Sequence, residues 1–192
     1  MNPTHFIAQQ LPSRDGYTWT LPSRLSAILA EVEGRYGERD RSYTVLGIEF
    51  GPETPMLWYP GSRKHIVVQL ALNALDDTAL ALYQLAHECV HLLSPTGGVN
   101  APVLEEGLAT IYSEEYVARE FNRTGLTNIA SYIHAASLVR QLLQHDDQAI
   151  PKLRALEPSF VRLTSEHFQR VLAGVDGVLV QQLLTRFDRA RA

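Results

Sequence analysis

The chain has 192 residues, 45% of them hydrophobic, and a formal net charge of −4. This length and composition suit one domain with its own core, and the negative charge argues against a nucleic-acid or anionic-membrane surface. The single cysteine excludes an intrachain disulfide and a metal site built from several cysteines.

The first elements along the chain are a helix and three strands. Apolar residues at helical spacing, among them Leu25, Ile28 and Val32, predict a helix over Leu21–Tyr36 that Gly37 ends. The strand candidates are rich in β-branched and aromatic residues and are separated by Gly-Pro and Pro-Gly turns. They cover Ser42–Phe50, Pro55–Tyr59 and His65–Leu70.

A second helix is predicted over Thr78–Leu93, with Asp76 or Asp77 as its cap and Ser94-Pro95 after its end. It carries the string His87-Glu88-Cys89-Val90-His91. Histidines at i and i+4 lie on one helix face, about 5–6 Å apart, so both imidazoles can bind one Zn²⁺ ion. The adjacent Glu88 can then act as the general base on a water at the metal.

The next helix should begin near Pro102 and supply a third ligand. A short connection makes the two helices an antiparallel hairpin, which brings the Glu105-Glu106 pair to the level of His91. Adjacent helical residues point about 100° apart, so only one glutamate can face the metal. We favour Glu106, whose face continues through small residues that allow close helix packing: Ala109, Thr110 and Ser113. Glu105 is then either solvated or an acid that supports a ligand.

The rest of the chain is expected to be helical. Candidate helices are Asn128–Gln144, Ser165–Leu172 and Asp176–Arg189, with breaks at Pro151 and Pro158. The expected fold class is therefore α+β, in a single domain over residues 1–192. Residues 1–93 should hold a backing helix, the small sheet and the histidine-bearing helix, and residues 94–192 should form a helical subdomain that begins with the glutamate helix.

The string H-E-C-V-H followed by E-E-G-L-A resembles the gluzincin clan of zinc metallopeptidases, over roughly Lys64 to Tyr116. The resemblance implies a zincin-like fold in which His87, His91 and Glu106 bind zinc. Two features depart from larger clan members. The interval from His91 to Glu106 is short, and Thr110 stands where thermolysin-like members carry an acid that orients a histidine. Thr110, Ser113 or a backbone carbonyl would then have to orient it.

The resemblance also implies features around the metal. In the clan, the strand before the motif helix often rims the cleft, so His65–Leu70 could pair with an extended peptide or be an ordinary internal strand. A tetrahedral intermediate needs a donor to its oxyanion. The candidates are Tyr132 and His134, for which the alternatives are a core tyrosine and an exposed histidine.

The function expected from these residues is zinc-dependent peptide hydrolysis, with a peptide or protein as the substrate. A zincin-like domain that binds or regulates without cleaving is the alternative, and a third reading treats the motif as coincidental in a helical interaction protein. Mixed nitrogen and oxygen ligands also accept Mn²⁺ or Fe²⁺. The opening residues show no export signal and no apolar run reaches ~18 residues, so we expect a cytoplasmic protein without a nucleic-acid or membrane partner. The sequence carries no signal of oligomeric state.

Overall fold

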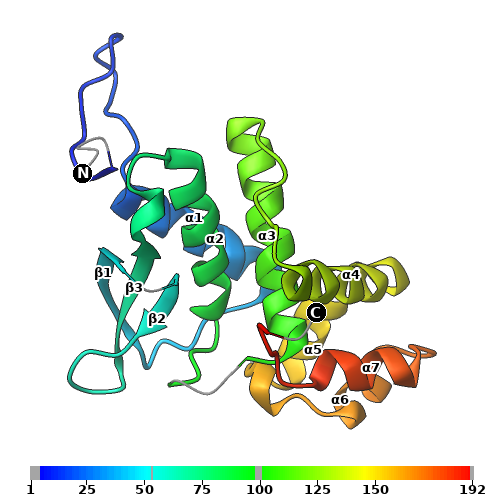
Figure 1. Cartoon of the computed structure of the whole chain (residues 1–192). Helices are drawn as coiled ribbons and strands as arrows, with labels where there is room; N and C mark the ends of the chain where they lie inside the picture. The colour runs from blue at the N-terminus through cyan, green and yellow to red at the C-terminus, as the bar shows by residue number, and fades with distance from the viewer. Residues whose placement is uncertain (1–4, 53, 98–100, 191–192) are drawn as a thin grey trace.

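The computed structural model describes residues 5–52, 54–97 and 101–190. Residues 1–4, which we searched for an export signal, lie outside this range. Within the described residues, seven α-helices and a three-stranded sheet form an α+β fold (Figure 1). In chain order they are α1 (Leu21–Tyr36), β1 (Thr44–Gly51), β2 (Met56–Trp58), β3 (His65–Ala71), α2 (Thr78–His91), α3 (Val103–Phe121), α4 (Ala130–His145), α5 (Ala149–Leu156), α6 (Ser165–Val171) and α7 (Gly177–Leu184).

The sheet is mixed, and β3 is its central strand. β1 pairs with β3 in parallel, and β2 pairs with it antiparallel, with Met56 opposite Gln69 and Trp58 opposite Val67. The expectation that His65–Leu70 offers a free edge to a substrate is therefore wrong. The short turn after β2 folds that strand back onto β3 and occupies the hydrogen-bonding edge that a peptide would need.

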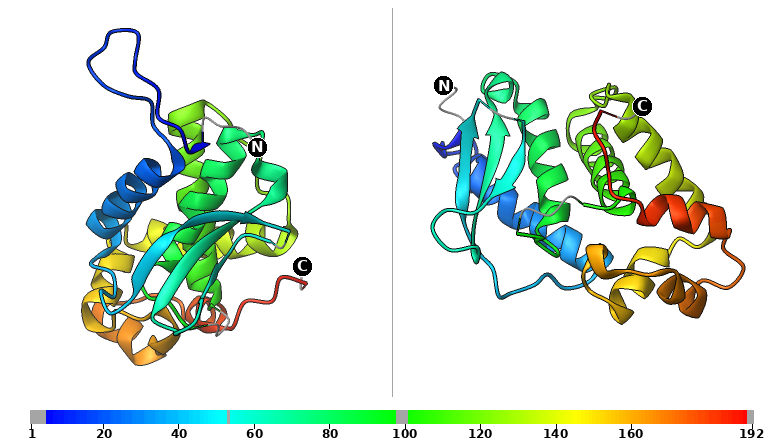
Figure 2. Two further views of the ribbon diagram at one scale, coloured as in Figure 1. Left: turned by 90° about the vertical axis from the view of Figure 1, so that its left-hand side faces the viewer. Right: turned by 60° about the horizontal axis from the view of Figure 1, so that its bottom comes forward.

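Two helices cover one face of this sheet. Both views in Figure 2 place α1 and α2 on the same side of the strands. Asp77 caps the start of α2, and its side chain accepts a hydrogen bond from Leu80 N at 3.0 Å. Nearly the whole surface of α2 is buried, as its continuous apolar sequence predicts, because the sheet and α1 cover one side of it and α3 covers the other.

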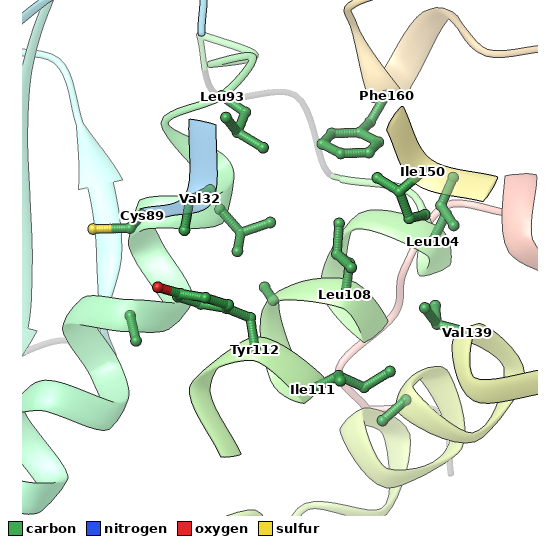
Figure 3. Packing of buried hydrophobic residues seen from close by; sticks show 14 of the residues in the cluster. Val32, Cys89, Leu93, Leu104, Leu108, Ile111, Tyr112, Val139, Ile150 and Phe160 are labelled. Carbon is green, nitrogen blue, oxygen red and sulfur yellow. The ribbon is translucent and has the colours of Figure 1, made fainter. Parts of the chain in front are cut away.

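One core cluster connects all these layers. Figure 3 shows side chains of α1, α2, α3, α4 and α5 meeting in it, including Val32, Cys89, Leu108, Val139 and Ile150. The same cluster reaches α6 and α7 through Phe168 and Leu183. Among the described helices, none is both long and apolar enough to cross a bilayer.

The helices after α4 differ from the expected ones in two places. α5 was not predicted, because Pro151 was taken as a break. The helix begins two residues earlier, so Pro151 lies in the first turn, where its missing N–H is not needed. The last helix was predicted to reach Arg189 but ends at Leu184.

The chain after α7 is extended because it pairs with the start of α3. Val103 N donates to Thr185 O, and Phe187 N donates to Ala101 O, both at 2.9 Å. These two hydrogen bonds make up an antiparallel bridge between Pro102 and Arg186, which takes the place of further turns of helix. This pairing is long-range, so no local pattern in the sequence indicates it.

Close packing of α3 on α4 depends on Gly107. A methyl group at this position would lie 2.4 Å from Ala135 O and 2.6 Å from Val139 Cγ2. Gly107→Ala should therefore lower the free energy of unfolding by about 1–3 kcal/mol despite its better helix propensity. Denaturant unfolding of the metal-free protein measures this.

The matched control is Gly34→Ala in α1, where nothing lies within 4 Å of the added methyl group. This exposed substitution should raise stability by up to about 1 kcal/mol. Equal effects of the two substitutions would show that the α3–α4 contact tolerates a side chain.

Candidate metal centre

The two histidines of the motif lie on the same face of α2. The ring centroids of His87 and His91 are 5.1 Å apart, which is the one-turn separation expected of residues at i and i+4. Helix α3 runs beside α2 and brings the two glutamates of its first turn to this face. We call His87, Glu88, His91, Glu105 and Glu106 the acid–imidazole cluster.

Glu106 completes a set of three donors. Its Oε2 lies 3.2 Å from His87 Nε2 and 3.7 Å from His91 Nε2, and the three ligand atoms lie within 4.8 Å of one another. Ligands about 2.0–2.2 Å from a tetrahedral zinc ion stand roughly 3.3 Å apart, so these separations suit such a site. Two imidazoles and one carboxylate also leave the fourth position open.

Glu105 supports His91 from the other side of the ring. His91 Nδ1 and Glu105 Oε1 are 2.8 Å apart, and Glu105 is only 1% exposed. If Nδ1–H donates this hydrogen bond, the lone pair of Nε2 faces Glu106 and the metal position. The expectation that Glu105 is solvated is thus wrong. The structure agrees with the other alternative, in which Glu105 supports a histidine.

The residues expected to orient a histidine make local contacts instead. The Thr110 hydroxyl donates to Glu106 O at 2.8 Å, and the Ser113 hydroxyl donates to Thr110 O at 2.9 Å. Hydroxyl groups in a helix readily bond the preceding turn, and the contact that Ser113 makes with α2 is to Tyr83 and not to a histidine. Their small size still permits the close approach of α3 to α2.

Burial and charge act in opposite directions within the acid–imidazole cluster. Burial raises the pKa of Glu88 and of Glu105 above the ordinary values, although both histidines oppose this at Glu88 and His91 opposes it at Glu105. Burial would lower the pKa of His91, but Glu106 and Glu105 outweigh it and hold that pKa well above its ordinary value. Burial would raise the pKa of Glu106, but His91 and His87 outweigh it and hold that pKa well below its ordinary value. The cluster therefore attracts positive charge, whether protons or a cation.

A cavity of about 680 Å³ opens beside the cluster. His87 and Glu88 form part of its wall, together with residues from the connection between β1 and β2, from the turn after β3, and from residues 125–129 before α4. Glu88 is 3% exposed, so what remains of its surface faces this space. The hydrogen bond of 2.8 Å between the hydroxyl groups of Tyr83 and Thr127 ties the wall before α4 to α2.

Of the two candidate oxyanion donors, the structure brings only Tyr132 to the cavity. Its ring lies 5.7 Å from the ring of His87, in an edge arrangement, and it lines the same cavity as Glu88. Burial raises the pKa of Tyr132, so its hydroxyl keeps the proton that a donor needs. His134 is exposed and is not among the residues that line this space.

Two residues at or beside this cavity were not predicted from the sequence. Phe187 packs on Tyr132 with ring centroids 4.7 Å apart, and Arg189 lines the cavity. The expected helix over Asp176–Arg189 concealed both, because a residue on a surface helix carries no signal of a site. An arginine after a short helix becomes informative only when the path of the chain is known.

Comparison of the chain with protein-family models, with curated proteins and with solved structures returns no significant match. The geometry of the acid–imidazole cluster and its cavity therefore carries the functional argument.

If the cluster binds zinc, the two glutamates should make separable contributions to its affinity. Glu106→Gln should lower zinc affinity by more than about 100-fold, because it removes the charged ligand. Glu105→Gln should lower it by only about 10–100-fold, because it alters the partner of a ligand. Competition against a chelating dye at neutral pH gives both values.

The control is Glu115→Gln on the same helix, where the carboxylate is half exposed and paired with Arg35. Its zinc affinity should equal that of the unsubstituted protein. A larger loss in Glu105→Gln than in Glu106→Gln would reverse the assignment of the ligand.

Proposed function

We propose that the protein is a zinc-dependent metallopeptidase of compact, gluzincin-like type. The observation that carries the proposal is the convergence of His87, His91 and Glu106 beside a cavity, with Glu105 on the far nitrogen of His91. Three ligands with an open position are typical of catalytic rather than structural zinc sites. Structural sites are closed by four protein ligands, and they do not need a cavity.

The arrangement of elements supports a zincin-like fold. A small sheet leads into the histidine helix, and an antiparallel glutamate helix packs against it (Figure 1). This is the order that the resemblance to gluzincins implies for the catalytic half. The short interval between His91 and Glu106 suits it, because both residues lie near the connection of the hairpin.

Glu88 is the proposed general base. A zinc ion bound at the site would supply a Lewis acid that lowers the pKa of a coordinated water towards ~7. Glu88 accepts the proton of the water that attacks the peptide carbonyl carbon, and it later delivers that proton to the leaving amine. Its burial suits this function, since a carboxylate with a raised pKa is a stronger base at neutral pH.

Tyr132 is the proposed donor to the developing oxyanion. It comes from α4 and lines the same cavity as Glu88 of α2, so a peptide carbonyl bound there can meet both the base and the hydroxyl. The cavity volume lies within the range of small-molecule and short-peptide sites. A peptide or a flexible segment of a protein is therefore the proposed substrate.

Substitution of the base tests whether the site is catalytic. Glu88→Gln keeps the size of the side chain and leaves the three ligands intact. Zinc content and thermal stability should remain near those of the unsubstituted protein, whereas peptide hydrolysis should fall by about 10²–10⁴-fold. Mass spectrometry of a random peptide mixture incubated with each protein measures hydrolysis without a known substrate.

Equal cleavage by both proteins would remove Glu88 from the mechanism or indicate a contaminant. If both bind zinc and neither cleaves, the non-catalytic zincin-like alternative replaces the peptidase. Absence of zinc after reconstitution would leave the motif as coincidental.

Substitution of the donor tests the transition-state contact. Tyr132→Phe should lower kcat by about 10²–10³-fold and leave zinc content unchanged, because the hydroxyl acts on the oxyanion and not on the metal. His134→Gln, on the exposed side of the same helix, should retain full activity. Loss of activity in His134→Gln alone would transfer the role to that histidine.

A further inference from the structure

Residues 185–190 bring Arg189 to the cavity wall and are held in place by several contacts. In Figure 2 (right) it is the red trace that leaves α7 and runs beside α3 and α4. Its backbone pairs with residues 101–103, as described above. Phe187 packs on the ring of Tyr132, and the Ser131 hydroxyl donates to Arg189 O at 2.9 Å. These contacts fix the backbone of Arg189 next to the proposed oxyanion donor.

Arg189 brings a positive charge to this wall. Among the described residues that line the cavity, Arg189 is the only arginine and Glu88 is the only residue with a carboxylate. The guanidinium belongs to none of the salt bridges of the described chain, whereas Arg123, for example, is paired with Asp77 at 2.5 Å. Arg189 also opposes the rise that burial causes in the pKa of Tyr132, as a cation close to that hydroxyl should.

A carboxylate is the ligand that such a group fits. A guanidinium presents paired N–H donors that match the two oxygens of a carboxylate, and the resulting hydrogen bonds are charge-assisted. The rest of the cavity wall offers neutral and apolar side chains, so a single anionic group on an otherwise uncharged ligand would be complementary to it.

We propose that Arg189 is a specificity-determining residue that binds a carboxylate of the peptide, either its C-terminal carboxylate or the side chain of an Asp or Glu. That this ligand is a substrate rests on the proposed peptidase function. A terminal carboxylate at this position would make the protein a carboxypeptidase or a peptidase of short peptides. An acidic side chain would make it an endopeptidase selective for acidic sequences.

Binding to a protein that cannot cleave provides the test. Zinc-loaded Glu88→Gln protein is immobilised and offered acetylated random hexapeptides that lack Asp and Glu, half as free acids and half as amides. A second mixture contains only amides, with Glu or Gln at one position. Mass spectrometry of the retained peptides reports the preference for each source of carboxylate.

We expect roughly tenfold enrichment of the free acids in the first mixture or of the Glu peptides in the second. Adding Arg189→Gln to the bait should abolish the enrichment. Adding Arg186→Gln should preserve it, because Arg186 lies in the same segment but does not line the cavity. No retention, equal retention of both forms, or an enrichment that survives Arg189→Gln would overturn the proposal.

The proposed peptidase function is judged separately, by hydrolysis of the same mixtures with the unsubstituted zinc protein. Hydrolysis without an Arg189-dependent preference overturns the carboxylate site and leaves the peptidase standing. An Arg189-dependent preference without hydrolysis supports the carboxylate site and removes the peptidase, so the two failures give different results.

Discussion

Three carboxylates and two imidazoles lie together between α2 and α3, and the surrounding structure must accommodate their charge. Glu88 and Glu105 are almost fully buried, and the side chains of His91 and Glu106 are only 14% exposed. Removal of an unpaired carboxylate from water costs several kcal/mol, so such a cluster requires nearby positive charge. Arg154 supplies some of it, because its guanidinium attracts the carboxylate of Glu105. That guanidinium donates hydrogen bonds to the backbone carbonyls of Tyr36, Glu38 and Pro158, which fix its position. A divalent cation between the three ligands would supply the remainder.

Two adjacent glutamates of α3 contact the two sides of the same histidine ring. Two neighbouring positions of a helix point about 100° apart, so Glu106 can face the metal position while Glu105 reaches around to the Nδ1 side of His91. One turn of α3 thus provides both the proposed ligand Glu106 and the partner of His91 Nδ1. In the thermolysin-like gluzincins that the motif resembles, an orienting acid lies further along the helix, where this chain has Thr110. The connection between α2 and α3 brings the first turn of α3 to the level of His91, so the residues that contact this histidine must come from that turn.

Local patterns predicted the elements whose own sequence determines them. The bounds of α1 agree with the expectation, and the histidine helix and the start of the glutamate helix agree to within two residues, since apolar periodicity and capping residues define them. The central position of β3, the length of α7 and the place of Arg189 at the cavity depend on long-range pairing: β2 folds onto β3, and Thr185 and Phe187 pair with residues 101–103. α5 could not be predicted from Pro151, because a proline is found both after the end of a helix and in the first turn of one. In the site, spacing indicated the ligands, but only the packing of α4 distinguishes Tyr132 from His134.

The start of α3 links the proposed chemistry to the proposed recognition. Its first turn carries Glu105 and Glu106, and the residues just before it pair with the segment that carries Phe187 and Arg189. A shift of this turn would therefore move a metal ligand and the carboxylate-binding residue together. Backbone hydrogen bonds join the paired segment to Ala101 and Val103, so the segment would follow the first turn of α3. Recognition of the peptide and assembly of the catalytic groups would then be coupled by a rigid contact, since both depend on the same few residues at the base of one helix.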